Sequence, residues 1–317
     1  MAERGPGRPP VEILLAAYNG ERWVAEQIGS ILAQTSTEWT LVIRDDCSTD
    51  GTFEIVADYA RRYPDRVVAS RRAENSGSAR DNFLEMLGES RAPYVMFADD
   101  DDVWLAEKVA QTLARMRELE AEHGPDTPLL VHGDLAVTDG ALTVVASSMA
   151  ELQRLDGRES QLSHLVVQNY ATGCTVMVNR ALADLVRPPF DGAIMHDWWL
   201  LLIAGAFGRI AYLDVPLVLH RQHGKNTVGA IDAHSWRYNL RRQRDTAGTA
   251  RRDVGTRRQA EAFLAAFADR LTPDQAELLR AYVDLPRQGK LARLRTLSRY
   301  GFWKNTTLRR LAQLWSV

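Results

Sequence analysis

The chain is predicted to be an α/β protein with a doubly wound, mostly parallel sheet, and three features of the sequence support this. Short apolar runs alternate with helical patterns over residues 1–125. The runs are apolar throughout, as in strands that are covered on both faces. Polar, turn-forming residues follow each run. Such alternation is typical of parallel sheets with right-handed crossovers.

The first half of the chain has four expected strands. They are Val11–Ala16, Trp39–Arg44, Val67–Ser70 and Pro93–Ala98. Between and after them, apolar residues recur at helical spacing. One helical face carries Trp23, Val24, Gln27, Ile28, Ile31 and Leu32, another carries Phe53, Val56, Tyr59 and Ala60, and a third carries Val109, Leu113, Met116 and Leu119 and ends near Gly124-Pro125.

Residues 126–222 are expected to mix strands with short helices, and the chain from about residue 235 is expected to be helical only. The strands are Leu129–His132, Thr172–Asn179, Ile210–Leu213 and Leu217–Arg221. Thr272-Pro273-Asp274 has the pattern of a helix start, and Pro286 is expected to end that helix. We therefore predict a disordered lead-in (1–10), a domain (11–234) with halves 11–125 and 126–234, and a helical C-terminal extension (235–317).

The composition is that of an ordinary globular protein, with 45% hydrophobic residues among 317. It excludes wholesale disorder, collagen-like and coiled-coil architectures. The two cysteines, Cys47 and Cys174, are too few for a disulfide scaffold or a structural zinc site, and they fit a reducing cytoplasm. The most lipid-like run, Trp198 to Gly208, has 11 residues, and a spanning helix needs about 20.

The charge is divided unevenly along the chain. Residues 1–234 hold 21 Lys+Arg and 34 Asp+Glu, a net of −13, whereas residues 235–317 hold 18 and 7, a net of +11. A basic region joined to an acidic domain points to a separate partner for that region.

Polar and acidic groups follow all four strands of the first half. They are Ala17–Glu21, Asp45–Thr52, Asn75–Gly77 with Arg80, and Asp99–Trp104. In open sheets of this kind ligands bind outside the carboxyl ends of the strands. The simplest interpretation, that such residues cap the following helices, suits Ser48, Thr49, Asp50 and Asp102.

Capping does not explain Asp99, Asp100 and Asp101 together. Adjacent carboxylates on one rim repel one another unless a cation compensates them. Oxygen ligands without cysteine or paired histidine favour Mg²⁺ or Mn²⁺, typically shared with a phosphate. The sequence therefore predicts a divalent metal site after the fourth strand.

The combination of AAYNGE, RDDCSTDGT, FADDDDVW and MHDWW resembles family 2 glycosyltransferases of the GT-A fold. The resemblance covers residues 11–227 in order and is strongest to the rhamnosyltransferase-like branch of bacterial surface polysaccharide synthesis. It implies an inverting, metal-dependent transferase. The expected donor is a UDP- or dTDP-sugar, with rhamnose suggested by the branch, and the expected acceptor is a polysaccharide or lipid-linked glycan.

The resemblance also implies roles for individual residues of the first half. Ala17, Tyr18 and Asp46 would hold the nucleotide base, with Asn19 and Glu21 in the same site, and Asn75 and Arg80 would lie along the ribose and diphosphate. Asp99 or Asp100 would contact the ribose, and the metal ligands would be Asp101, Asp99 and His223. Asp100 stands where the branch often has Gln, and His220 where it usually has Tyr.

In the second half, Asp197 of MHDWW matches the catalytic base of the family, although a lone Asp at a helix start is more often an N-terminal cap. Gly173 would border the acceptor pocket. One of Trp198 and Trp199 is expected in the core, and Trp198 is assigned to the acceptor. His196 would tune the base or pack beside it.

Three further expectations concern the same half of the domain. Arg221 or Lys225 would meet the diphosphate. Asp134 would reach sugar hydroxyls. Cys174 is expected to be a small buried strand residue.

The basic region suits an anionic membrane surface, because cationic helices with tryptophans bind such surfaces. In Phe302–Val317, Leu308, Leu311 and Leu314 recur on one helical face. The alternative is a solvated helical cap on the domain. No nucleic-acid motif accompanies the charge, so nucleic acid is not an expected partner. We expect a cytoplasmic protein, peripheral on the inner face of the plasma membrane.

Two other functions compete with glycosyl transfer. A non-catalytic assembly partner that binds nucleotide sugar or glycan is compatible with the motifs. A sugar nucleotidyltransferase would need a Gly-rich phosphate loop with a basic residue in the first turn, which here has the sequence AAYNGERW. A Mg²⁺ phosphohydrolase is disfavoured because no nucleophile motif is recognisable.

Overall fold

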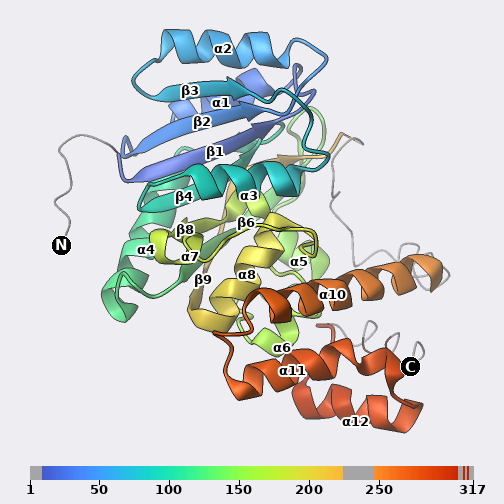
Figure 1. Cartoon of the computed structure of the whole chain (residues 1–317). Helices are drawn as coiled ribbons and strands as arrows, with labels where there is room; N and C mark the ends of the chain where they lie inside the picture. Colours follow the sequence, from blue (N-terminus) through green and yellow to red (C-terminus); the bar gives the residue numbers. More distant parts are fainter. Residues whose placement is uncertain (1–8, 224–245, 306–309, 311–312, 314–317) are drawn as a thin grey trace.

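The computed structural model describes residues 9–223, 246–305, 310 and 313 of the chain. They form one sheet of nine strands, with helices on both faces (Figure 1). The strands are β1 Val11–Ala17, β2 Trp39–Asp45, β3 Val67–Arg71, β4 Tyr94–Asp99, β5 Val103–Trp104, β6 Leu129–Thr138, β7 Val144–Ala146, β8 Met177–Asn179 and β9 Arg209–Arg221.

The helices follow the chain around this sheet. They are α1 Val24–Leu32, α2 Thr52–Arg62, α3 Ala79–Glu89, α4 Lys108–His123, α5 Met149–Gln153, α6 Leu162–Leu165, η1 Gly173–Thr175, α7 Arg180–Ala183, α8 His196–Phe207, α10 Thr246–Ala266, α11 Pro273–Val283, η2 Leu285–Arg287 and α12 Lys290–Tyr300.

The predicted parallel sheet is confirmed for the first half. Strands β3, β2, β1 and β4 are neighbours in that order and all pair in parallel. Alternate residues of β1 enter two cores: Leu14 packs with α3 and α8, whereas Ile13 and Leu15 pack with α1, α2 and α4. Because Ala17 is in register with Asp45 and Ala16 with Asp99, the ends of these strands meet at one edge.

The second half of the sheet is mixed, so the expectation of a mostly parallel sheet describes only the first half. Strand β8 pairs antiparallel with β4 and β6, whereas β6 and β9 are parallel. The expected strand Thr172–Asn179 is the 3-10 turn η1 followed by the short β8.

Strands β6 and β9 are longer than expected. Strand β6 continues past His132 to Thr138. The expected strands Ile210–Leu213 and Leu217–Arg221 are the two ends of the continuous β9. Register shifts beside Asp134 let both strands stay paired along their length.

The helix boundaries agree with the local signals. Helix α4 ends at His123, and Gly124 follows with a φ of 87°, a conformation that favours glycine. Thr272 forms a capping box with Gln275, and Pro273 is the first residue of α11. Helix α11 ends at Val283, and Pro286 lies in η2 beyond it.

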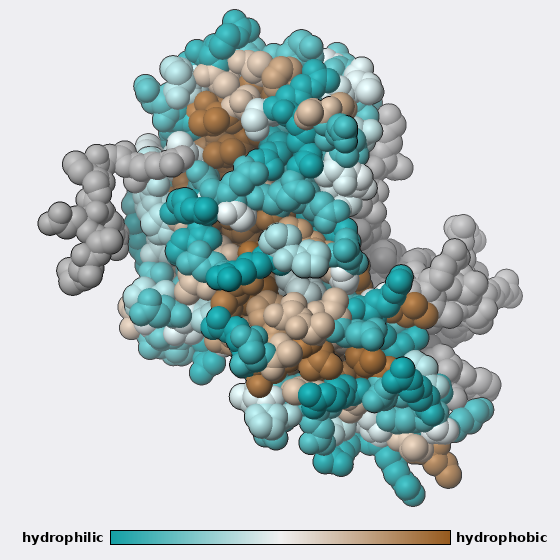
Figure 2. Space-filling view, in the orientation of Figure 1, coloured by the Kyte–Doolittle hydropathy of each residue, from teal (hydrophilic) through white to brown (hydrophobic). Residues whose placement is uncertain are grey.

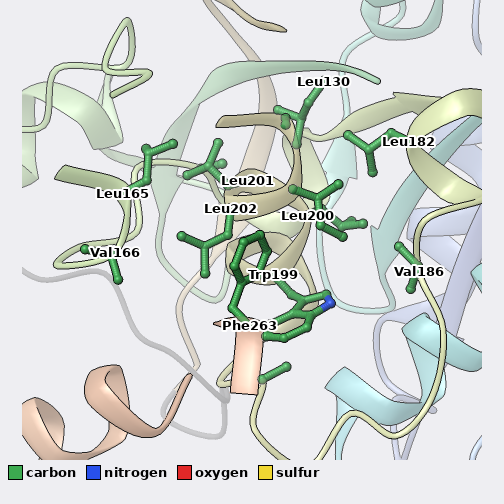
Figure 3. Packing of buried hydrophobic residues seen from close by; sticks show 14 of the residues in the cluster. Leu130, Leu165, Val166, Leu182, Val186, Trp199, Leu200, Leu201, Leu202 and Phe263 are labelled. Atoms are coloured by element: carbon green, nitrogen blue, oxygen red, sulfur yellow. The ribbon is translucent and has the colours of Figure 1, made fainter. Parts of the chain in front are cut away.

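The C-terminal helices share the core of the domain. Phe263 of α10 is fully buried, and its ring lies 5.4 Å from that of Trp199 in an edge-on arrangement (Figure 3). Tyr282 of α11 packs on Phe302 at 5.1 Å. This supports the alternative of a helical cap on the domain for the described part of residues 235–317.

The expected helix Phe302–Val317 does not begin at Phe302, because Phe302 is buried and residues 302–305 are not helical. Leu308, Leu311 and Leu314 lie outside the described residues, as do Lys225 and residues 1–8 of the expected lead-in. None of the helices in the described part of the chain combines the length and apolar character needed to cross a bilayer.

Candidate functional site

A cleft of about 1280 Å³ opens where β1, β2 and β4 end, and it extends to the start of α8. It is lined by most of the residues that the sequence assigned to binding or catalysis. Those residues are Ala17, Tyr18, Asn19, Glu21, Asp46, Asn75, Arg80, Asp99, Asp100, Asp101, Gly173, Asp197 and His223.

The loops after β1 and β2 form one rim of the cleft because their side chains bind each other. The Asn19 backbone N–H donates to Ser48 Oγ at 3.0 Å, and Asn19 Oδ1 accepts from the Thr49 N–H at 2.9 Å. Glu21 Oε2 accepts from the Gly51 N–H at 3.0 Å. Asn19 and Glu21 therefore hold the rim together, a role that sequence reasoning did not assign to them.

Tyr18 is hydrogen-bonded to the acidic turn, which consists of Asp99, Asp100, Asp101 and Asp102. The Tyr18 side chain is 53% exposed, so a ring face is open for stacking. Its backbone N–H donates to Asp100 Oδ2 at 2.8 Å. Gly20 sits tightly here, since a Cβ at that position would lie 2.4 Å from Asp100 Oδ2.

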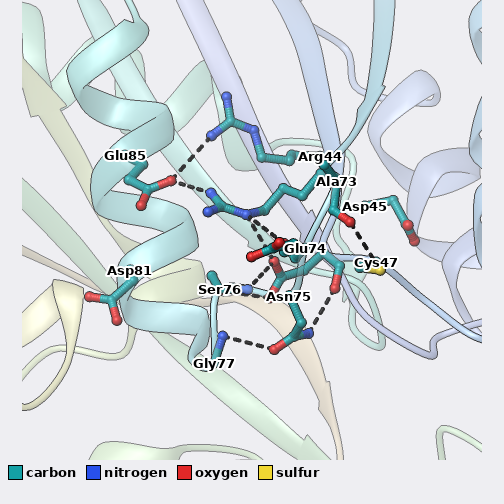
Figure 4. A network of polar contacts seen from close by, with 12 residues as sticks. Arg44, Asp45, Cys47, Ala73, Glu74, Asn75, Ser76, Gly77, Asp81 and Glu85 are labelled. Carbon is teal, nitrogen blue, oxygen red and sulfur yellow. Dashed lines mark hydrogen bonds and ion pairs between the residues drawn. The ribbon is translucent and has the colours of Figure 1, made fainter.

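Asp46 lines the cleft and is hydrogen-bonded to the loop after β3, whose residues Asn75 and Ser76 are labelled in Figure 4. Its carboxylate accepts from the Ser76 N–H at 2.9 Å and from Ser76 Oγ at 2.7 Å, and Arg72 Nε lies 3.4 Å away. Asn75 Nδ2 donates to the Asp46 carbonyl at 2.7 Å. The network fixes both Asp46 and Asn75 beside the cleft.

The carboxyl groups of Asp99, Asp100 and Asp101 are largely buried from water, so they lie in a region of low dielectric constant. Burial, with repulsion from neighbouring aspartates, raises the pKa of Asp99 well above its ordinary value and that of Asp100 to about 7. Burial and Asp102 also raise the pKa of Asp101, against a lowering by the hydrogen bond from His223. Ionisation of all three carboxyls together is unfavourable unless a cation compensates their charge.

Asp102 differs from its three neighbours because it is enclosed by protein. Its Oδ1 lies 2.9 Å from His220 Nδ1 and accepts from the Arg221 backbone N–H at 3.2 Å. Burial disfavours a charged His220, but Asp102, Asp99 and Asp101 together raise its pKa. Asp102 thus ties the turn to β9. The interpretation of Asp102 as a helix cap is wrong, because helix α4 begins at Lys108 and has no side-chain cap.

Arg221 of β9 connects the acidic turn to α1. It is fully buried, and its Nε donates to the Asp101 carbonyl at 2.9 Å while Nη2 pairs with Glu26 Oε2 at 2.5 Å. Its guanidinium also lies 4.1 Å from the Trp23 ring centroid. The expectation that Arg221 meets a diphosphate is wrong, because the guanidinium is enclosed and does not line the cleft.

His223 and Asp101 are the cleft residues best placed to hold a divalent ion. His223 Nε2 lies 2.8 Å from Asp101 Oδ2, and its ring stacks on Trp23 with centroids 5.8 Å apart. A carboxylate and an imidazole, completed by phosphate oxygens, fit Mg²⁺ or Mn²⁺. In the described chain, Asp102, Cys174 and His220 also gather ligand atoms within 4.8 Å, but all three are buried, and of them His220 alone lines the cleft.

Asp197 occupies the other end of the cleft, in the first turn of α8. Helix α8 has Met195 as its N-cap without a side-chain cap, so Asp197 does not cap the helix. The carboxyl is 7% exposed. Burial raises its pKa to about 6, although hydrogen bonds from Trp198, Asn169 and Gly173 oppose the rise. A buried carboxyl with such a pKa is suited to accept a proton near neutral pH.

His196 packs beside this carboxyl and is held neutral. Its ring lies 4.3 Å from Phe83 and 5.2 Å from Phe97, and burial lowers its pKa to about 3. Gly173 is required next to it, because a Cβ at that position would lie 2.5 Å from His196 Nε2. Of the two roles expected for His196, packing fits these contacts.

Residues 12–123 match the family model described as glycosyl transferase family 2. This match over about a third of the chain, together with the relatives below, shows that the chain is a glycosyltransferase. The matched segment holds the rim loops, the Asp46 network and the acidic turn.

Two relatives and one solved structure are similar to this glycosyltransferase. The dTDP-rhamnosyl transferase RfbG of Shigella flexneri is 25% identical over 227 residues, which cover 68% of this chain and 74% of the relative. The putative teichuronic acid biosynthesis glycosyltransferase TuaG of Bacillus subtilis is 29% identical over 186 residues, covering 57% and 67%. S. aureus TarS 1–349 in complex with UDP-GlcNAc superposes with a TM-score of 0.53 at 18% identity, covering 92% of each chain, which shows the GT-A fold.

Two sequence assignments of the glycosyltransferase are wrong in the acceptor half. Trp198 does not line the cleft, since its Nε1 donates to the Leu165 carbonyl at 2.6 Å and the ring packs on the core. Asp134 does not face the cleft either, because it accepts from the Met149 and Ala150 N–H groups, both at 3.1 Å, at the start of α5. Trp199 is in the core, as expected of one member of the pair.

Arg80 lies at the cleft, whereas Cys174 lies in the core. Arg80 lines the cleft while its Nη1 donates to the Ala193 carbonyl at 2.6 Å, so it also holds the loop before α8. Cys174 is buried as expected, although in η1 rather than in a strand. Sequence reasoning missed Trp23, Ser76 and Asn169 as parts of the site. No spacing signal marks these residues, because their partners lie far away in the chain.

Proposed function

We propose that this glycosyltransferase belongs to family 2 and moves a sugar from a UDP- or dTDP-sugar to a glycan acceptor of the bacterial cell surface, with metal dependence and inversion of configuration. One observation carries the proposal. The cleft holds an acidic turn beside an exposed aromatic ring at one end and a single buried carboxyl of raised pKa, Asp197, at the other.

The donor nucleotide is assigned to the end formed by β1, β2 and β4. The open face of Tyr18 suits a stacked pyrimidine, and Asp46, held by Ser76 and Arg72, suits acceptance of the imide proton. Asn75 and Arg80 line the next part of the cleft, where ribose and diphosphate would lie. Asp99 or Asp100 is proposed to contact the ribose hydroxyls.

Mg²⁺ or Mn²⁺ is assigned to Asp101 and His223, with Asp99 as a further ligand. When bound, such an ion stabilises the charge that develops on the departing nucleoside diphosphate. The protein contributes a preorganised pair, because Arg221 holds the Asp101 backbone and Trp23 supports the His223 ring. The raised pKa values of Asp99, Asp100 and Asp101 support a cation at this turn.

Asp197 is assigned as the catalytic base. Its carboxylate would take the proton of the acceptor hydroxyl while that oxygen attacks the anomeric carbon and the diphosphate leaves from the opposite side. That end of the cleft is lined by Met149, Gln153, Leu155 and residues 169–173 and 194–197, and Asp197 is the carboxylate among them. A single base without a nucleophilic partner supports one displacement, and therefore inversion. Gly173 is proposed to border the acceptor.

The sugar and the cellular setting are proposed from the relatives. A relative named as a dTDP-rhamnosyl transferase supports rhamnose and dTDP, and one named for teichuronic acid biosynthesis supports a surface glycan as the product. We further propose that the enzyme is cytoplasmic and works at the inner face of the plasma membrane. The excess of positive charge in residues 235–317 supports this placement.

Replacement of Asp197 by Asn tests the assignment. Once a thermal-shift screen with Mn²⁺ has found the stabilising nucleotide sugar, the Asn variant is expected to bind it with unchanged affinity. Its transfer rate should fall by about a hundredfold or more, because the base is lost. Asp184→Asn, an exposed change at the residue that follows α7, is the matched control.

The outcomes separate donor binding from catalysis. Full turnover by Asp197→Asn would remove the assigned base. Asp101→Asn is expected to abolish the Mn²⁺ dependence of nucleotide affinity, measured by titration calorimetry. Equal affinity with and without Mn²⁺ in the parent enzyme would remove the metal site from the proposal.

A further inference from the structure

We propose that helix α12 and the turn η2 before it form a surface that docks on an anionic lipid bilayer. The inference rests on the proposed function in one respect, namely that a transferase acting on a membrane-anchored acceptor must work beside the membrane. It replaces the amphipathic helix expected at Phe302–Val317 with a different and defined surface.

The charge of this segment is of one sign. Residues 285–317 contain eight Lys+Arg and no Asp or Glu. Six of these cations, from Arg287 to Lys304, lie in the continuous described stretch of η2, α12 and the turn after it. A cluster of this size close to a helix attracts anionic lipid headgroups.

Helix α12 has a fixed inner face and an open outer face. Its inner side is held by the buried Leu297 and by Arg293, whose Nε donates to the Leu285 carbonyl at 3.0 Å. On the outer side, Lys290 and Arg295 are exposed and have no ion pair or hydrogen bond within the described chain. Two cations that the protein does not compensate are available to a partner.

An exposed leucine lies between these cations. Leu291 is 73% exposed, although every other leucine of α12 is at least partly covered. Figure 2 shows mostly hydrophilic side chains in the part of the molecule that holds α12. An apolar residue flanked by cations suits shallow insertion at the headgroup boundary, with the charges at the phosphates. A nucleic acid would use the cations but not Leu291.

The surface is rigidly connected to the acceptor end of the cleft. Gln259 of α10 accepts from the backbone N–H of Ile194, a cleft residue, at 2.8 Å. Tyr282 of α11 stacks edge-on with Phe302, which follows α12. Figure 1 shows α12 at the end of the molecule opposite α2, with α8 between them. Docking through α12 would therefore hold the acceptor end near the bilayer.

Phe302 and Lys304, which follow α12, make contacts within the protein. Phe302 is fully buried, and Lys304 Nζ pairs with Asp253 Oδ1 at 3.0 Å. These two groups are not available to lipid while the fold is intact. The outer face of α12 thus combines two free cations with an exposed apolar side chain.

Sedimentation with vesicles tests the surface in the full-length protein. The probes are phosphatidylcholine vesicles, alone and with about one third phosphatidylglycerol. Lys290→Glu combined with Arg295→Glu is expected to lower the partition onto the anionic vesicles about tenfold or more. The control is Arg61→Glu combined with Arg62→Glu, which changes the net charge equally on the exposed face of α2. Leu291→Ser is expected to weaken binding without a change in charge.

Three results would overturn the inference. They are equal loss of binding in the α2 control, equal binding to neutral vesicles, and tighter binding to a DNA duplex than to anionic vesicles at the same salt. Folding of each variant is checked by circular dichroism. Nucleotide affinity should stay unchanged in the α12 variants, so a failure of glycosyl transfer with intact vesicle binding would count against the proposed function alone.

Discussion

Four consecutive aspartates have different environments although they share one residue type. Asp102 is enclosed and bonded to His220, whereas Asp101 meets His223 at the edge of the cleft. Asp100 accepts from the backbone of Tyr18. Asp197, far away in the chain, combines deep burial with hydrogen bonds that only partly offset it. Environment, rather than residue type, distinguishes a structural carboxylate from one suited to hold a cation or accept a proton.

The raised pKa of Asp197 predicts a pH dependence of transfer. A base works only when ionised, so kcat/KM should fall as the pH drops through about 6, the value to which burial raises this carboxyl. The measurement is a pH–rate profile at saturating Mn²⁺. A limb set by an ordinary exposed carboxyl, near pH 4, would contradict the assignment.

The same pKa predicts the sign of a stability change. Between pH 3.8 and about 6, Asp197 is mostly protonated in the folded protein but mostly ionised in the unfolded chain. The free energy of unfolding therefore decreases as the pH rises through this window. Asp197→Asn removes the charge and should therefore be at least as stable as the parent at pH 8. Urea unfolding of the two proteins at pH 5 and pH 8 measures the difference.

At the scale of elements, the turn η1 and helix α8 meet so closely that one glycine sets their distance. Gly173 touches His196, and His196 in turn packs on Phe83 and Phe97 below Asp197. The Asp197 carboxyl is therefore positioned by contacts among three segments: η1, α8 and the sheet core.

Gly173→Ala is expected to disturb this contact. The new Cβ would lie 2.5 Å from His196 Nε2, so the start of α8 must shift. We expect a loss of about 1–3 kcal/mol in the free energy of unfolding, and a fall in kcat larger than any change in nucleotide affinity. Gly29→Ala in α1, where a Cβ meets nothing within 4 Å, is the control and should be neutral or slightly stabilising. Equal effects of the two changes would contradict the argument.

At the scale of the whole molecule, the C-terminal helices and the sheet domain share one core. Phe263 of α10, and Phe267 in the turn after this helix, pack with Trp199 and Phe207 of α8. Helix α10 also binds the loop before α8 through Gln259. The two regions of opposite charge are therefore expected to unfold together.

Phe263→Ala tests this unity. Loss of a fully buried phenylalanine is expected to cost about 3–5 kcal/mol, and the sheet and the C-terminal helices should still unfold in one transition. Val254→Ala, an exposed change on the same helix, should cost less than about 0.5 kcal/mol. Separate transitions by fluorescence and circular dichroism would show that the helices form an independent unit.

Much of the first half could be predicted from local pattern. Apolar runs such as Val11–Ala16 and helix signals such as Gly124 and Thr272 depend on near neighbours, and the structure has the elements there. The motifs at the strand ends also converge on one cleft, because parallel strands in register bring their carboxyl ends together. The sequence by itself therefore determined the parallel half of the sheet and the edge at which the site lies.

The tertiary structure alone decided how the second half uses its residues. The antiparallel pairing of β8, the burial of Arg221 against Glu26 and the core position of Trp198 all depend on partners distant in the chain. Such contacts leave no periodic trace, because a side chain's role there follows from which surface the fold brings to it. For the same reason only the fold separates Asp101, open to the cleft, from Asp102, which is sealed beneath it.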